Sequence, residues 1–320
     1  FGCNMGFCQY PVFMFLWIVK KTLKRYCQND EFRRHLKLSW LGKMQVSLHE
    51  HPRALGDYPL HAAAQYGLEE VLTTLVSSGH QINKQTFDGA TPLHQACQVA
   101  NLECVKILLE AGASVNAYNI DGDTPLCEAC ASGNLELVKL LLDHGAEINP
   151  GLNYCTPLHE VILGGDRPEL VELLLDHGAI INFNDTNFGM PLHVATMKNN
   201  IRCAEVLLKR GCNVNAIMNH ETALHIAAKK NNVDILKLLV QFGGSVNMTN
   251  RLHKRPLDLT RMHSPAREFL NNFCRYPISL RQICRLSLRR YLVERHSLSL
   301  ISAMELPHLI RQYLSYDISL

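Results

Sequence analysis

The sequence contains few charged and aromatic residues and no apolar run long enough to cross a membrane. Charged residues make up 19% and aromatic residues 7% of the 320 positions. The longest apolar segment, residues 7–19, is interrupted by Gln9 and Pro11, and it is shorter than the roughly 20 residues that a membrane-spanning helix needs. Lysines follow this segment instead of preceding it, which is the reverse of a secretory signal. These features exclude a membrane-spanning transporter and a small secreted domain.

The sequence also lacks the short motifs that mark common catalytic and nucleotide-binding sites. It contains no HExxH, no P-loop, no GxGxxG and no GxSxG pattern. Recurrent carboxylates such as Asp143 and Asp176 are interpreted as a solvated helix face. We therefore predict that the chain is not an enzyme and that it binds no metal and no cofactor.

The net charge is small, but it is unevenly distributed. Residues 1–53 carry 9 basic and 3 acidic side chains, residues 54–250 carry 11 and 21, and residues 251–320 carry 12 and 5. The centre therefore has a charge of 11 − 21 = −10. This argues against a nucleic-acid-binding surface along the whole chain. It favours a basic patch on any protein that the centre binds.

Among the residues that are present, twelve cysteines stand out. Because no secretory signal accompanies them, we interpret them as reduced thiols rather than as a disulfide framework. The prediction is a cytoplasmic protein, with the nucleus as the alternative location.

Residues 1–53 form an N-terminal extension that is partly apolar and basic. Because the first residue is Phe1 rather than Met, we expect the sequence to be processed or incomplete. Residues 7–19 allow two interpretations. One is a helical or poorly ordered extension that packs on the following region or is an artefact of the gene prediction, and the other is an anchor at a membrane surface.

A four-residue motif recurs seven times after this extension. It is written Thr91-Pro-Leu-His94 in its complete form, and its second residues lie at positions 59, 92, 125, 157, 191, 223 and 256. Glycines at 79, 112, 145, 178, 211 and 243 and asparagines at 83, 116, 149, 182, 215 and 247 keep the same period. Repetition at 32 to 34 residues indicates a solenoid built from similar units.

Each recurring residue has a physical reason for its position. Thr caps a helix by accepting a backbone N–H, Pro occupies the first helical position, and Leu packs inward. The glycine that follows the second helix ends it in the left-handed conformation. Ala100 stands where other units carry Gly or Asn, so we predict mild local strain there.

The three series resemble the ankyrin-repeat family over about residues 54–270. The resemblance implies an all-α solenoid of helix-turn-helix and β-turn units, with six full repeats and a partial seventh. It also implies that the motif histidine bonds the backbone of the next repeat, a pattern from which Cys127 and Asp258 depart. Such a stack has a long surface and no pocket by default, which favours protein binding.

Cys127 and Cys130 have the spacing of half a zinc site or of a redox pair. In phase with the repeat, however, Cys127 replaces the motif histidine and Cys130 replaces a small core residue. We interpret both as buried structural thiols.

The chain becomes basic where the repeats end, and its pattern predicts further helices. Ser279 is a natural helix cap, and Leu280, Cys284 and Leu288 recur every four residues on one face. Ile283 and Leu292 widen this apolar stripe. The prediction for Arg281, Arg285 and Arg289 is that they face away from it. Pro307 can open a final helix.

Residues 277–316 resemble a SOCS box of three helices. Ser279-Leu280, Cys284 and Leu288 match its S-L-x-x-x-C-x-x-x-aliphatic signature. Leu306-Pro307 lie where that box places its cullin-contacting element, although Leu309 replaces the second proline of many members. The whole chain thus resembles the ankyrin-repeat and SOCS-box family over residues 54–316.

The resemblance implies a non-catalytic substrate receptor of a cullin–RING ubiquitin ligase. Elongin C, accompanied by elongin B, would receive one helix in a groove, through Ser279, Leu280, Ile283, Cys284 and Leu288. Cullin-5 with its RING subunit would contact Leu306, Pro307 and Leu309. The repeats would hold a protein substrate.

Apolar residues at the turn tips between repeats are candidates for substrate binding, namely Phe87, Tyr118, Tyr154, Phe188 and Met218. An alternative is that several of them fold onto neighbouring tips. Two other functions remain open. One is a ligase-independent ankyrin scaffold or inhibitor with a helical C-terminal cap, and the other is a membrane-tethered adaptor that uses residues 7–19.

Overall fold

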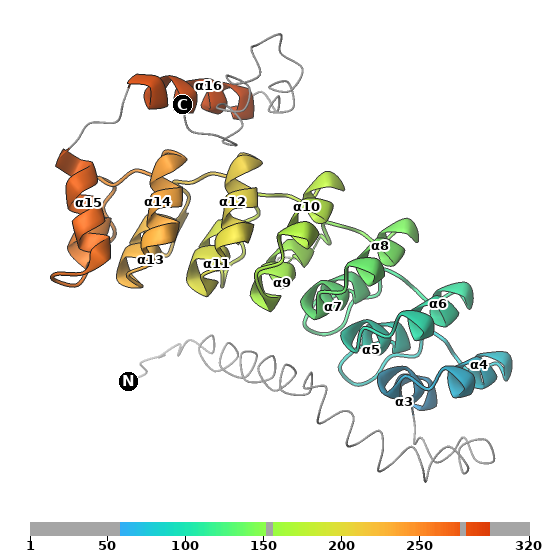
Figure 1. Ribbon diagram of the computed structural model, residues 1–320. Coiled ribbons are helices and arrows are strands. Elements are labelled where there is room, and N and C mark those ends of the chain that lie inside the picture. Colours follow the sequence, from blue (N-terminus) through green and yellow to red (C-terminus); the bar gives the residue numbers. More distant parts are fainter. Residues whose placement is uncertain (1–57, 152–155, 276–279, 295–320) are drawn as a thin grey trace, which may run out of the picture.

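The computed structural model describes residues 58–151, 156–275 and 280–294. Antiparallel helix pairs stack side by side in chain order and form a curved slab (Figure 1). The first three pairs are α3 (Pro59–Tyr66) with α4 (Glu69–Ser77), α5 (Pro92–Gln98) with α6 (Leu102–Glu110), and α7 (Pro125–Ser132) with α8 (Leu135–Asp143). The next three are α9 (Pro157–Gly164) with α10 (Pro168–Asp176), α11 (Pro191–Lys198) with α12 (Ile201–Lys209), and α13 (Ala223–Lys229) with α14 (Val233–Gln241).

The stack ends in a shorter unit, and one more helix lies outside it. A 3-10 turn, η2 (Pro256–Leu259), precedes α15 (Pro265–Arg275), and α16 (Leu280–Glu294) follows. Two short strands, β1 (Ile217–Met218) and β2 (Glu221–Thr222), pair antiparallel in one of the turn tips. The predicted solenoid of helix pairs is confirmed. Of the three helices predicted for the C-terminal module, α16 lies within the described residues.

The predicted threonine cap forms at α7, whereas the Thr156 hydroxyl makes no cap bond and lies 2.8 Å from the Nδ1 of His159. The hydroxyl of Thr124 accepts the N–H of Cys127, and Pro125 is the first residue of α7. Gly112 follows α6 with a φ of 85°, in the left-handed region that glycine adopts without a steric penalty. Ala100 has a φ of 57°, so the predicted local strain is confirmed.

The core is a continuous apolar layer between the two rows of helices. Each unit contributes leucines from its first helix, such as Leu93 and Leu126, and from its second helix, such as Leu108 and Leu141; all four are fully buried. Burial of each such side chain stabilises the fold by about 1.5–3 kcal/mol. Because consecutive units share this layer, each repeat depends on its neighbours for its core.

The motif histidines connect consecutive repeats, as predicted. Their Nε2 atoms bond backbone carbonyls of the next unit at 2.9–3.2 Å, in the pairs His61–Ala90, His94–Asp123, His159–Gly189, His193–Ala216 and His225–Lys254. A carbonyl can only accept, so Nε2 carries the hydrogen. Nδ1 is then the acceptor, and in His94 it accepts the backbone N–H of Thr91 at 3.1 Å.

Asparagines of the recurring series make a second set of connections. The side chain of Asn116 donates to the Gly145 carbonyl at 3.1 Å and accepts the Glu147 N–H at 2.9 Å. Asn149 bonds Gly178 and Ile180 in the same way. Asn116 and Asn149 thus each satisfy a carbonyl at the end of the following helix pair and an N–H in its loop.

No helix among the described residues is long and apolar enough to span a bilayer. The segment 7–19, considered above as a membrane anchor, lies outside the described residues.

Candidate functional site

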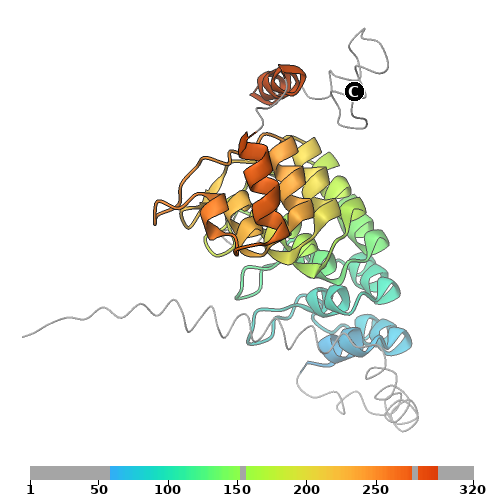
Figure 2. The same ribbon diagram turned by 60° about the vertical axis from the view of Figure 1, so that its left-hand side comes forward.

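The first candidate surface is α16, which lies across the ends of α12 and α14 (Figures 1 and 2). Arg285, Arg289 and Leu292 are buried, with exposed fractions of 6%, 6% and 4%. Leu286 lies against the turn after α14, where a Cβ added to Gly243 would be 3.2 Å from its Cδ2 atom. Residues 285, 289 and 292 are about one turn apart, so they define the side of α16 that faces the stack.

The contact of Arg289 is the best defined part of this interface. Its Nη2 donates to the carbonyl of Lys209, the last residue of α12, at 2.7 Å. Its guanidinium carbon lies 5.9 Å from the ring centroid of Phe242, the C-cap of α14. The last carbonyls of a helix have no partner within the helix and carry partial negative charge, so a guanidinium at these two helix ends is favourable.

Arg285 and Arg289 were predicted to face away from the apolar stripe of the helix, and they do lie on a different side of α16 from Cys284. Leu292, predicted to widen that stripe, is instead buried on the arginine side. The sequence did not indicate that this side faces the stack, where the Lys209 carbonyl and the Phe242 ring accommodate Arg289. The side chain of Arg281, predicted to face the same way, lies outside the described residues.

The opposite side of α16 is open to solvent. Cys284 and Ser287 are exposed, Tyr291 is 50% exposed and Leu288 is half-buried. Their spacing of three and four residues places them on one face of the helix. Of the predicted elongin-binding residues, the structure thus places Cys284 and Leu288 on or beside the open face.

Other residues predicted for this module lie wholly or partly outside the described residues. Leu280 is the first residue of α16, but its side chain and that of Ile283 are not among those described. Ser279 and the predicted cullin-contacting residues Leu306, Pro307 and Leu309 also lie outside the described residues.

The second candidate surface is the row of turn tips. The first two tips are held side by side, because Ile120 donates its N–H to the Asp88 carbonyl at 3.0 Å and the Gln85 amide donates to the Tyr118 carbonyl at 3.4 Å. Phe87 projects from the first tip with 94% of its surface exposed. Its ring edge contacts Tyr58 at a centroid distance of 6.3 Å.

The other predicted tip residues differ from Phe87. Tyr118, Phe188 and Met218 are half-buried. Phe188 packs against the core, and Met218 lies against Gly189, where an added Cβ would be 2.6 Å from its Cγ and Sδ atoms. Met218 therefore follows the alternative in which a tip residue folds onto its neighbour. Tyr154 lies outside the described residues.

Sequence reasoning missed three exposed apolar tip residues. Ile120, Ile217 and Leu252 are 60%, 54% and 69% exposed. Ile120 lies exactly one 33-residue period after Phe87, so the repeat itself contained the signal. Ile217 belongs to β1, and its exposure depends on a hairpin that the repeat period does not predict.

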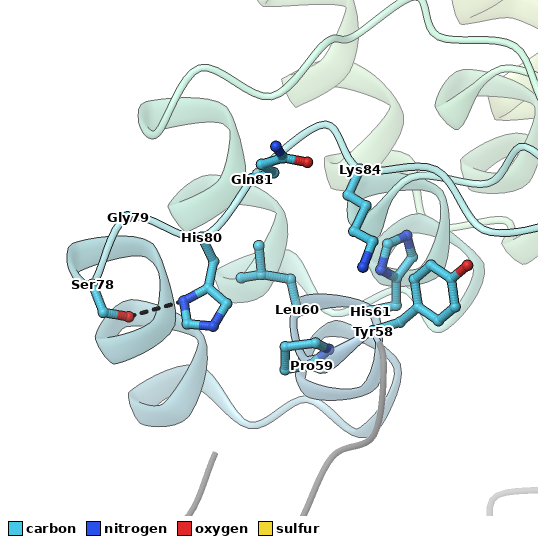
Figure 3. Close-up of a pocket in the computed structure, with 9 residues that line it drawn as sticks. All are labelled: Tyr58, Pro59, Leu60, His61, Ser78, Gly79, His80, Gln81 and Lys84. Carbon is cyan, nitrogen blue, oxygen red and sulfur yellow. Dashed lines mark hydrogen bonds between the residues drawn. The ribbon is translucent and has the colours of Figure 1, made fainter. Parts of the chain in front are cut away.

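A hollow of about 460 Å³ lies beside the first repeat (Figure 3). It is lined by α3, by the loop after α4 and by Lys84, whose ammonium lies 4.6 Å from the Tyr58 ring centroid. His61 is bonded to the Ala90 carbonyl, and the Nδ1 of His80 is 3.0 Å from the Ser78 hydroxyl oxygen. Both histidines have structural hydrogen bonds, and the hollow presents no acid–base pair aligned for catalysis.

The cysteine pair is structural in its surroundings. Cys127 and Cys130 are buried in α7. Burial raises the pKa of the Cys127 thiol far above its usual range, and burial likewise raises the pKa of Cys130. Such thiols are poor nucleophiles. Among the described residues, no group of three or more His, Cys, Asp or Glu side chains could hold a metal ion.

Comparison with protein families divides the chain into two parts. Residues 60–151 and 149–218 match a model of three ankyrin-repeat copies, and residues 219–251 match a single ankyrin repeat. Residues 276–315 match the SOCS box.

Individual relatives and solved structures agree with this division. A segment of 130 residues is 38% identical to ankyrin repeat and SOCS box protein 5 of Bos taurus and 37% identical to the Homo sapiens protein, covering 41% of this chain and 39% of each relative. The match thus spans about two fifths of these relatives. The human ASB11 ankyrin repeat domain superimposes with a TM-score of 0.64 at 33% identity, covering 69% of this chain and 99% of that domain. The ankyrin repeat domain of Bcl-3 superimposes with a TM-score of 0.58 at 29% identity, covering 68% of this chain and 99% of that domain.

Proposed function

This chain belongs to the ankyrin repeat and SOCS box protein family, and we propose that it is the substrate-recognition subunit of a cullin-5 ubiquitin ligase. The observation that carries the proposal is the open face of α16. A helix that directly follows the repeat stack leaves Cys284 of the elongin signature exposed, while the other side of the helix is buried against the stack. An exposed face of this kind suits binding in a groove of a partner.

The proposed division of labour follows from the two surfaces. Elongin C binds α16 through Leu280, Ile283, Cys284 and Leu288, with Ser279 as the cap, and elongin B accompanies it. Cullin-5 and its RING subunit bind next to Leu306, Pro307 and Leu309. The chain itself is non-catalytic and acts inside the cell by holding the substrate near the ubiquitin-transferring subunits, which supply the chemistry.

The proposal is tested by co-purifying the full chain with elongins B and C. The matched variants are Leu280→Asp, in the elongin signature, and Leu252→Asp, which makes the same substitution at an exposed leucine in a turn tip. Circular dichroism checks that all three chains are folded. We expect a ternary complex with the wild type and with Leu252→Asp, and none with Leu280→Asp. A folded wild-type chain without a complex would overturn the proposal.

The cullin assignment has its own test. A double substitution of Leu306 and Pro307 by alanine should keep the elongin complex and lose cullin-5 in the same purification. Retention of cullin-5 at wild-type level would show that these residues are not the contact.

For the substrate, we propose the tip surface formed by Phe87, Ile120, Ile217 and Leu252. Exposed aromatic and aliphatic groups are what a protein interface buries, and the first two tips are fixed to each other by hydrogen bonds. Candidate substrates can be captured by proximity labelling with the wild type and with Phe87→Ser combined with Ile120→Ser. If both chains label the same proteins equally, this would argue against substrate binding by the first two tips.

The runner-up function is a ligase-independent ankyrin scaffold. The specific observation in its favour is that α16 covers the ends of α12 and α14, as a cap would. In that case Leu280→Asp would destabilise the last repeats without the loss of any particular partner, which the circular dichroism control detects.

A further inference from the structure

We propose that Arg289 is a positioning residue that fixes the orientation of α16 on the repeat stack. Its consequence for ubiquitin transfer rests on the proposed function, but its effect on α16 itself does not. The guanidinium joins three elements that are distant in sequence, because it extends from α16, bonds the last residue of α12 at 2.7 Å and lies over the ring of the residue that follows α14, 5.9 Å from its centroid. One side chain thus connects α16 to two consecutive repeats.

The chemistry of this contact requires arginine. The planar guanidinium can donate to a carbonyl and at the same time present a flat face to an aromatic ring, whereas a lysine ammonium is a compact charge that cannot do both equally well. Arg289 is only 6% exposed, so water competes little for its hydrogen bond. A charge-assisted bond in this setting is stronger than an exposed ion pair.

Neighbouring contacts turn this single attachment into a fixed angle. Arg285 and Leu292 are buried one turn before and one turn after Arg289, and together they span about 10 Å along the helix. Leu286 adds a contact with the turn at Gly243. Contacts distributed along the helix prevent α16 from tilting about one point, with Arg289 at their centre.

The fixed angle matters for a receptor that works by placement. The face with Cys284 points away from the stack because the opposite face is attached to it. The elongins, the cullin and the ubiquitin-transferring subunits would therefore extend in a set direction from the tip surface. That direction determines which lysines of a bound protein come within reach, an effect of orientation rather than affinity.

The test is hydrogen–deuterium exchange on the full chain without partners. Arg289→Met removes the charge and keeps the length of the side chain, and Phe242→Leu removes the ring while it leaves the sequence of α16 intact. Arg289→Lys tests whether charge alone suffices, and Arg251→Ala, at an exposed position, is the control for loss of an arginine.

We expect amides of residues 280–294 to exchange about tenfold faster in Arg289→Met and in Phe242→Leu, as the loss of one desolvated cation–π contact or charged hydrogen bond predicts. Arg289→Lys should recover only part of the protection, and Arg251→Ala should match the wild type. Unchanged exchange in α16 for both Arg289→Met and Phe242→Leu would overturn the proposal. If Arg289→Met abolishes the helix itself, the exchange of α16 in Phe242→Leu decides the question, since that variant leaves the sequence of α16 unchanged.

A second readout separates positioning from binding. In a ligase reconstituted from elongins B and C, cullin-5 and its RING subunit, the probe is the set of ubiquitin-modified lysines on the repeat stack itself. Arg289→Met should keep elongin affinity within about threefold and change the distribution of modified lysines. An unchanged distribution would overturn the orientation role. Failure of the wild type to bind elongins would refute the proposed function and leave the exchange result valid.

Discussion

The repeat stack and α16 are attached to the rest of the molecule by different kinds of contact. Each unit of the stack shares an apolar core with its neighbours, and histidine and asparagine bonds of the same kind recur between most consecutive units. In contrast, α16 is attached on one side through two arginines, Leu286 and Leu292, and its other side is open. The difference teaches that the units of the stack depend on one another for their core, whereas α16 contacts the stack along one side only.

The largest effect expected from this comparison concerns one substitution made in both regions. Leu141→Ala in α8 and Leu292→Ala in α16 each remove a buried leucine. We expect Leu141→Ala to lower the free energy of unfolding of the stack by about 3 kcal/mol. Leu292→Ala should leave the stack unchanged and speed exchange only in α16. Urea denaturation followed by circular dichroism measures the free energy of unfolding of both variants, and hydrogen–deuterium exchange measures the protection of α16. Equal losses of unfolding free energy would mean that α16 is part of the same cooperative unit.

A smaller effect is expected from the bonds between repeats. His159→Ala should destabilise the stack by about 2 kcal/mol, because it removes the bond between repeats to the Gly189 carbonyl, which keeps only the Asp185 N–H, and leaves a cavity where the buried ring was. The control is His144→Ala, since His144 is exposed and bonds Leu140 within its own helix. That variant should remain within about 0.5 kcal/mol of the wild type. Equal denaturation midpoints for the two variants would show that the histidine bonds contribute no stability between repeats.

The same histidines make the stack sensitive to acid. Burial lowers the pKa values of His61, His193 and His225 below 6.5, and the backbone N–H groups that Nδ1 accepts in His193 and His225 also oppose protonation. The unfolded chain therefore binds more protons than the folded chain below about pH 6.5, so stability is lost as pH falls below that value. Denaturation midpoints at pH 7.5, 6.5 and 5.5 should decrease in that order.

His193→Gln provides the control for this pH dependence. Glutamine keeps a donor for the Ala216 carbonyl but cannot titrate, so the slope of stability against pH should become shallower. A midpoint that is constant from pH 7.5 to 5.5 in the wild type would contradict the assignment of neutral histidines.

How far the sequence predicted the structure also differs between the two regions. In the stack, a residue such as His94 recurs in the same environment, so the pattern identifies its role and the structure confirms its bond to Asp123. Ala100 was identified as a left-handed position because its equivalents are Gly and Asn. The same reasoning missed Ile217, whose exposure depends on a local hairpin.

In α16 the pattern identified the helix but not its orientation. The pattern separated Arg285 and Arg289 from the apolar stripe but did not indicate that their side of the helix faces the stack. Nothing in the sequence of α16 indicates that a helix end and the Phe242 ring of distant repeats accept Arg289. A helix without a repeat has no second copy from which its environment could be inferred.

The smallest structural effect is expected at the open face. Cys284 is exposed, whereas Cys97 and Cys130 are buried with pKa values raised by burial. In the native chain, iodoacetamide should modify Cys284 while Cys97 and Cys130 remain unmodified, and Cys284→Ser should change stability by less than about 0.5 kcal/mol. Mass spectrometry of the digested chain reads out each site. Modification of Cys97 before Cys284 would contradict the described packing.

The most direct test is whether the two faces of α16 have different roles, one in binding the elongins and the other in packing on the repeat stack. The measurement is the affinity of the elongin B and C complex for Cys284→Asp and for Arg289→Met by calorimetry, beside the wild type. The account predicts a loss of at least about 100-fold for Cys284→Asp, as burial of a charge in an apolar groove requires, and a change within about threefold for Arg289→Met. The reverse order, with binding lost in Arg289→Met and kept in Cys284→Asp, would contradict it.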